Sequence, residues 1–157
     1  MKNKMPDVPL TLWSRPHWEL RGRPDCALFF SQLSTAFPGA TTLFVEGTSI
    51  SRAVDDYLRS ATELGEYLPG RQTLWPQPKQ YRLPFNGVIL SGLATLAERS
   101  AAPELLDHLS IYIGSIALLE YPDAFANDCR VFISAEAVER NIQVFANILG
   151  LELSCIE

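Results

Sequence analysis

Apolar residues recur at helical spacing in four segments of the chain. Within residues 26–37 they stand at positions i, i+3, i+4, i+7 and i+11, the pattern of an amphipathic helix. Asp25 can cap this helix, and Pro38 followed by Gly39 ends it. Gly150 is placed to end the last helix. The other three stripes predict helices that begin near Ser51, Asn86 and Ser134, with Ser49 or Ser51 as the cap of the first and Asn86 and Ser134 as the caps of the other two.

Short runs of β-branched and aromatic residues between these helices predict strands. Residues 41–46 are mostly apolar, which indicates a buried central strand. Pro9 places the run at 8–13 on a sheet edge, because proline cannot donate to a ladder. The remaining runs are 81–85, 109–113, 116–120, 128–133 and 151–156. Residues 14–24, rich in arginine and proline, are interpreted as a loop.

Gly114 and Ser115 lie between two apolar runs, a pattern typical of a type II′ hairpin. A two-residue loop pairs residue 113 with 116, 111 with 118, 109 with 120 and 108 with 121. This register places His108 opposite Tyr121 and puts Leu119 on the same face of the sheet. Both faces of the hairpin are substantially apolar, so we expect it to lie well inside the sheet.

The order of elements favours an α/β or α+β fold, with a single mixed sheet of about five to seven strands and four helices packed on it. We expect parallel-type crossovers in the first half and an antiparallel meander at 109–133. The chain of 157 residues is long enough for one core, and we interpret 1–157 as a single globular domain. Residues 64–85 form a long connector within it, rich in proline and aromatic residues.

Charge is distributed unevenly along the chain. The formal net charge is −5, but residues 1–100 carry a net +2 and residues 101–157 a net −7. The overall acidity disfavours a nucleic-acid partner, whereas the local basic segments are compatible with a small anionic ligand. Three scattered cysteines without a CxxC spacing predict no metal site and indicate a reducing compartment. The sequence contains no secretory signal, membrane-spanning run or cofactor motif, so we expect a cytoplasmic protein without a cofactor.

Three residues are candidates for catalysis. Glu46 stands where a central strand ends and a helix follows, a position at which open sheets bind ligands. His108 lies at the base of the hairpin with Asp123 nearby, and a histidine beside carboxylates can act as an acid–base group. The sequence favours ordinary structural roles for these side chains over a catalytic role.

Two basic segments that contain aromatic residues are candidates for binding, because arginine and aromatic side chains are enriched in interfaces. The connector contributes Arg71, Trp75, Lys79, Tyr81 and Arg82. The first loop contributes Trp18, Arg21 and Arg23.

These patterns favour a small protein-interaction or regulatory module without catalytic activity, whose partner is another protein. The first alternative is a small enzyme or an anionic-ligand-binding domain that uses Glu46 and His108 at the strand ends. The second alternative is an immunity-type protein whose acidic residues between 104 and 139 neutralise a basic toxin. An edge strand or an exposed tryptophan also allows a homodimer.

Overall fold

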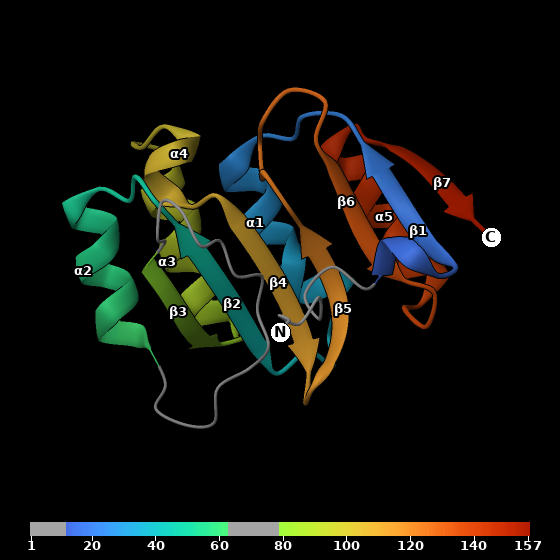
Figure 1. The fold of residues 1–157 in the computed structure, drawn as a ribbon, viewed down its shortest axis with the longest axis horizontal. Helices are drawn as coiled ribbons and strands as arrows, with labels where there is room; N and C mark the ends of the chain where they lie inside the picture. The colour runs from blue at the N-terminus through green and yellow to red at the C-terminus, as the bar shows by residue number, and fades with distance from the viewer. Residues whose placement is uncertain (1–11, 63–78) are drawn as a thin grey trace, which may run out of the picture.

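A computed structural model describes residues 12–62 and 79–157. Within these ranges, seven strands form one sheet in the order β3-β2-β4-β5-β6-β1-β7 (Figure 1). The strands are β1 (His17–Arg21), β2 (Thr42–Gly47), β3 (Lys79–Pro84), β4 (His108–Ile113), β5 (Ile116–Tyr121), β6 (Arg130–Ser134) and β7 (Glu152–Ile156). The predicted single sheet with packed helices, including the meander at 109–133, is confirmed. Every ladder between the described strands is antiparallel, so the expectation of parallel crossovers is wrong.

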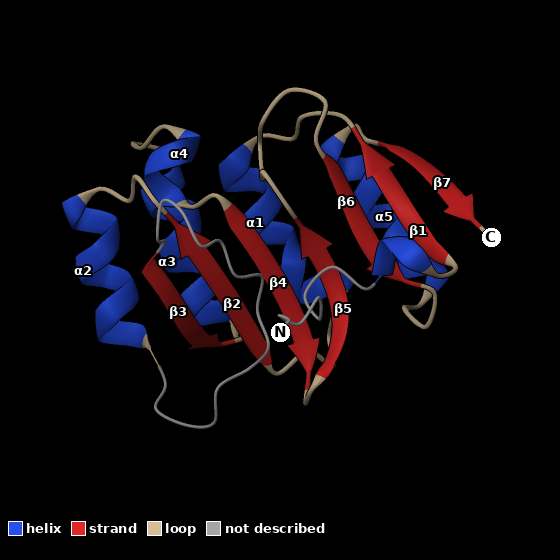
Figure 2. Cartoon of the chain, in the orientation of Figure 1, coloured by secondary structure: helices blue, strands red, loops and turns tan. Residues whose placement is uncertain are grey.

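Helices cover one face of this sheet. They are α1 (Cys26–Ala36), α2 (Arg52–Ala61), α3 (Gly87–Ala97), α4 (Ala102–Leu105) and α5 (Glu139–Leu149). Figure 2 shows α1, α3 and α5 behind the sheet, where α1 packs against both of the others. α2 lies beside the edge strand β3. No helix in the described ranges is long and apolar enough to cross a membrane.

Three of the predicted helix caps are confirmed. Asp25, Ser51 and Asn86 each accept a hydrogen bond from a backbone amide three residues further on. The fourth prediction is wrong, because Ser134 ends β6 and its hydroxyl accepts from the amide of Glu136 in a turn. α5 therefore starts later than predicted, and Gly150 ends it in the left-handed conformation, with φ of 69°.

The core between the helices and the sheet is built around Phe29 on α1. Its ring lies 5.3 Å from the rings of Tyr121 and Phe125 and 5.6 Å from the ring of Phe145, measured between centroids. These residues come from β5, from the loop after β5 and from α5, so one side chain joins three parts of the chain. Tilted and edge-to-face contacts of this kind stabilise a core beyond their buried area.

A β-bulge corrects the predicted hairpin register. Residues 113 and 116 pair as predicted, and so do Tyr112 and Ala117, but the register shifts by one between Ile111 and Tyr112. Leu119 then lies opposite Ile111, and Tyr121 lies opposite Leu109. The prediction that His108 lies opposite Tyr121 is wrong for this reason. Since one residue of slip exchanges the two faces, Leu119 and Tyr121 turn to the helical side and join the core.

The first strand lies where the sequence was interpreted as a loop. Leu12–Ser14 forms a short 3₁₀ helix, η2, rather than the end of a strand; the start of the predicted strand at 8–13 lies outside the described residues. β1 follows directly and pairs with both β6 and β7. Its side chains alternate, with Trp18 and Leu20 against the helices and His17, Glu19 and Arg21 on the opposite face.

Acid is expected to weaken the contact between α2 and β3. The hydroxyl of Tyr81 donates to the carboxylate of Asp55, and this bond, with the charges of Lys79 and Arg59, holds the pKa of Asp55 below its usual range. A lowered folded pKa adds stability above the unfolded value of about 3.9, and this contribution is lost as the pH falls through the folded pKa. In urea titrations, the stability difference between wild type and Asp55→Asn should therefore shrink as the pH falls below about 4. Asp56→Asn, exposed on the same helix, is the control; a pH-independent difference for Asp55→Asn would contradict this assignment.

Candidate functional site

The sheet face opposite α1, α3 and α5 carries an unusual number of buried polar side chains. We call it the polar face; its buried members include His17, Glu19, Glu46, Ser110 and Glu120. Glutamates are rarely buried this deeply unless they are paired. Each has a partner here, because Glu46 accepts from the side chain of Gln80 at 2.9 Å and Glu120 accepts from the backbone amide of Leu12 at 3.1 Å.

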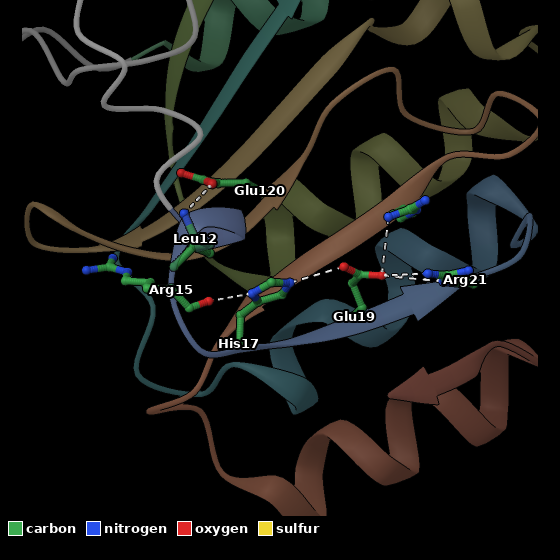
Figure 3. Close-up of polar contacts among 7 residues, drawn as sticks. Leu12, Arg15, His17, Glu19, Arg21 and Glu120 are labelled. Atoms are coloured by element: carbon green, nitrogen blue, oxygen red, sulfur yellow. Dashed lines mark hydrogen bonds and ion pairs between the residues drawn. The ribbon is translucent and has the colours of Figure 1, made fainter. Parts of the chain in front are cut away.

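A small apolar cluster lies on the same face. Leu12 of η2 is buried against Phe44, Tyr112 and Ala117, with Phe132 packed beside them. Figure 3 shows the hydrogen bond that the backbone amide of Leu12 donates to the carboxylate of Glu120. The 3₁₀ helix is therefore held on the sheet by an apolar side chain and a buried hydrogen bond, and the β5 and β6 strands lie under it.

Glu46 and His108 lie directly opposite each other on β2 and β4. Residues in this position in an antiparallel pair have neighbouring side chains. His108 also meets Asp123, since its Nδ1 accepts from the Asp123 amide at 2.9 Å and lies 3.9 Å from the carboxylate. The three candidate catalytic residues thus gather at one end of the sheet. The amide bond to Nδ1 and the Gln80 bond to Glu46 give His108 and Glu46 structural roles.

The segment that joins β5 to β6 and includes the first residue of β6, which we call the 122–130 loop, has strained backbone geometry. Asp123, Phe125 and Asp128 all have positive φ, between 50° and 66°, although none is a glycine. This left-handed conformation costs roughly 1–2 kcal/mol for a residue with a side chain. Three successive backbone amides of the loop donate hydrogen bonds to residues outside it. The Asp123 amide donates to His108 Nδ1, and the Ala124 amide donates to the Asp107 carbonyl at 2.8 Å. The Phe125 amide donates to the Tyr121 hydroxyl at 3.0 Å.

Tyr121, the residue before the loop, is buried and holds the loop in its conformation. Its hydroxyl donates a hydrogen bond or accepts one at Cys129 Sγ, 3.3 Å away, as well as accepting from the Phe125 amide. Burial and the nearby Cys129 raise the pKa of Tyr121 well above its usual range, so the hydroxyl stays neutral and keeps a proton to donate. The middle of the loop, at Phe125, and its C-terminal part, at Cys129, are therefore tied to one core side chain.

Three pockets lined by described residues surround the 122–130 loop. The first, of about 330 Å³, lies between the loop and α4 and includes Arg23 and Asp123. The second, of about 460 Å³, lies along the loop beside Phe132. The third, of about 600 Å³, is formed by residues 21–23 and 127–130, and we call it the arginine pocket. Asn127 lines all three. Neither Glu46 nor His108 lines any of these three.

The arginine pocket rests on a charged network of the polar face. Arg21 and Arg130 are direct partners on β1 and β6. The buried carboxylate of Glu19 serves both, with Oε1 lying 3.4 Å from Arg21 Nη2 and 3.7 Å from Arg130 Nη1. Its other oxygen lies 3.2 Å from His17 Nε2, as Figure 3 shows together with the contact between His17 and the Arg15 carbonyl. Glu19 therefore joins three basic side chains.

The structure separates the residues that the sequence grouped as binding candidates. Arg21 and Arg23 line the arginine pocket. Trp18 packs against the helical core instead. Tyr81, Lys79 and Arg82 lie on the edge strand β3, four strands from β6 and five from β1 in the sheet. Tyr81 is buried, and Lys79 pairs with Asp55 at 3.6 Å. Arg71 and Trp75 lie outside the described residues.

The acidic residues of the C-terminal third are also dispersed. Glu120 is wholly buried and unavailable to a partner. Asp128 precedes β6 and Glu136 follows it, so they lie at opposite ends of that strand. Asp107 and Asp123 line one pocket, whereas an acidic surface that includes both Asp128 and Glu136 would have to span the length of β6.

Sequence reasoning missed three members of the charged network, namely His17 as a buried residue, Glu19 and Arg130. The signal was present in residues 17–21, where polar and apolar side chains alternate in the pattern of a half-buried strand. The surrounding arginines and prolines directed the interpretation towards a loop. Arg130 could be placed only through the pairing of β6 with β1, which joins residues far apart in the chain.

Comparisons with protein-family models, with curated proteins and with solved structures gave no match. The fold alone therefore describes the class of the protein. It is an α+β fold in which an antiparallel sheet has helices on one face and a buried polar network on the other.

Proposed function

We propose that the protein is a binding module without catalytic activity that engages a partner protein through the 122–130 loop and the pockets around it. The observation that carries this proposal is the strain in the loop. Three non-glycine residues of the loop adopt the left-handed backbone conformation, each at an energetic cost. Residues with strained backbone conformations cluster at functional sites. The external bonds to the loop amides keep it in one shape, which lowers the entropic cost of binding.

The chemistry of the candidate catalytic residues supports binding rather than turnover. The Glu46 carboxylate accepts the Gln80 amide, and the Nδ1 lone pair of His108 accepts a backbone N–H. A general base must present its lone pair to the substrate, and here these acceptors are engaged with the protein itself. The adjacency of Glu46 and His108 is the observation that favours the rival, a small enzyme, and the experiment below distinguishes the two.

The test blocks the loop without touching its supports. Ala126 is exposed and lines two of the three pockets, so Ala126→Trp fills them; Thr95→Trp on the exposed side of α3 is the matched control. A partner is captured from host extract, purified, and titrated calorimetrically against each variant. We expect Ala126→Trp to weaken binding at least tenfold and Thr95→Trp to leave it unchanged. Equal affinity for both variants, or a turnover that is lost in Glu46→Gln or His108→Asn, would overturn the proposal.

A further inference from the structure

The pairing of Arg21 with Arg130 violates a rule of sheet stability. Like charges directly opposite each other on antiparallel strands destabilise the pair. Glu19 compensates only in part, because one carboxylate lies between two guanidinium groups and also meets His17. Local rules of this kind are broken mainly at functional sites, where the cost is offset elsewhere.

The arginine pocket has more positive than negative charge in its lining. Three arginines and Asp128 line it, so the formal net charge of these side chains is +2. Two carboxylates lie beside the arginines, namely Glu19, which also meets His17 at 3.2 Å, and Glu152, which lies opposite Arg21 on β7.

This excess charge faces the arginine pocket. The side chains of Arg21 and Arg130 are about half exposed, at 50% and 49%, so part of each guanidinium group is open to solvent. Arg23 adds a third guanidinium, which donates to Asn127 at 3.3 Å, and Asp128 adds one negative charge. The lining therefore keeps its net charge of +2 in a protein whose overall charge is −5.

We infer that the arginine pocket binds an oxyanion, a carboxylate or a phosphate, carried by the partner. The guanidinium group is planar and offers paired N–H donors that match the oxygens of both groups. A pocket of about 600 Å³ is large enough for such a group together with the residue that bears it. The inference rests on the proposed binding function and names the chemistry of the ligand at the same site.

The test titrates two oxyanions into the ¹⁵N-labelled full chain at constant ionic strength. Inorganic phosphate is the probe in one arm and glutarate, a dicarboxylate, in the other, with chloride as the balancing salt. We expect saturable shifts of the Gly22 and Cys129 amides and of the side-chain Nε–H signals of Arg21 and Arg130 in at least one arm. The arm with the tighter binding identifies the source of the oxyanion.

Variants of the pocket make the test specific. Arg130→Gln should weaken oxyanion binding at least tenfold, and Arg52→Gln on the distant helix α2 should have no effect. Arg23→Gln is a second variant of the pocket that leaves the buried Glu19 network intact, and it should weaken oxyanion binding about threefold or more. If Arg130→Gln does not fold, the affinity of Arg23→Gln for the oxyanion tests the inference. No saturable shift in either arm, or equal binding by the Arg23→Gln and Arg52→Gln variants, would overturn the inference.

The same variants separate this inference from the proposed function. If Ala126→Trp abolishes partner binding while the arginine variants leave it unchanged, the loop binds a partner but the oxyanion inference is wrong. If the arginine variants weaken partner binding in proportion to oxyanion binding, the inference is supported.

Discussion

Phe29→Ala is expected to lower the free energy of unfolding by about 3–5 kcal/mol, the usual cost of truncating a buried phenylalanine. Phe29 is completely buried and contacts the rings of Tyr121, Phe125 and Phe145. Its removal leaves a cavity between α1, β5 and α5 that these rigid rings fill poorly. Urea unfolding followed by circular dichroism measures the effect.

Leu28→Ala provides the matched control on the same helix, because Leu28 is 37% exposed and its truncation should cost much less than that of Phe29. Phe29→Ala should also broaden the amide signals of the 122–130 loop, since Phe125 and Tyr121 hold that loop and pack on the same ring. Equal destabilisation by the two variants would show that the aromatic cluster is not the centre of the core.

Glu19→Gln is expected to lower the free energy of unfolding by about 1.5–3 kcal/mol, the range for hydrogen bonds to charged groups, because the two arginines left behind are only half buried. The substitution keeps the size of the side chain but removes the charge that stands between Arg21 and Arg130. Two guanidinium groups would then face each other across β1 and β6 with no carboxylate between them. Urea unfolding at neutral pH measures the loss.

Phosphate should restore part of the stability of Glu19→Gln, because an anion that binds only the folded state stabilises it; at a hundredfold excess over Kd the gain is about 2.7 kcal/mol. Glu152→Gln is the control, since Glu152 lies opposite Arg21 on β7 but is exposed, and exposed ion pairs contribute little. If Glu19→Gln is as stable as Glu152→Gln, the carboxylate does not hold the arginine pair.

The sequence predicted the fold class because its strongest signals are local. The helical stripes, the caps at Asp25, Ser51 and Asn86 and the turn at Gly114 each depend on neighbouring residues, and each is present. The bulge in the hairpin could not be predicted, because it depends on which side chains of the hairpin pack against the helices. Burying Leu119 and Tyr121 against Phe29 favours the shifted register, and no local pattern specifies that contact.

The sequence indicated only separate parts of the candidate site, because these parts come together through contacts between distant segments. Arg21, Arg23 and Asp123 are among the candidates taken from the sequence, and the structure places them in the lining of pockets around the 122–130 loop. Their association depends on β1 lying beside β6, a pairing between distant segments. Glu19 and Arg130 become meaningful only in that pairing, since an isolated glutamate or arginine in the sequence indicates nothing more than an exposed side chain.

The position of β1 also sets the order in which the chain can be completed during synthesis. β1 is the first described strand, yet both its neighbours, β6 and β7, come from the last 28 residues of the chain. A chain emerging from the ribosome therefore exposes both edges of β1 until β6 and β7 have been made, and pairing across so long a separation is slow. The arginine pair and the arginine pocket form only after β6 has paired with β1, so the proposed binding surface depends on a contact between segments far apart in the chain.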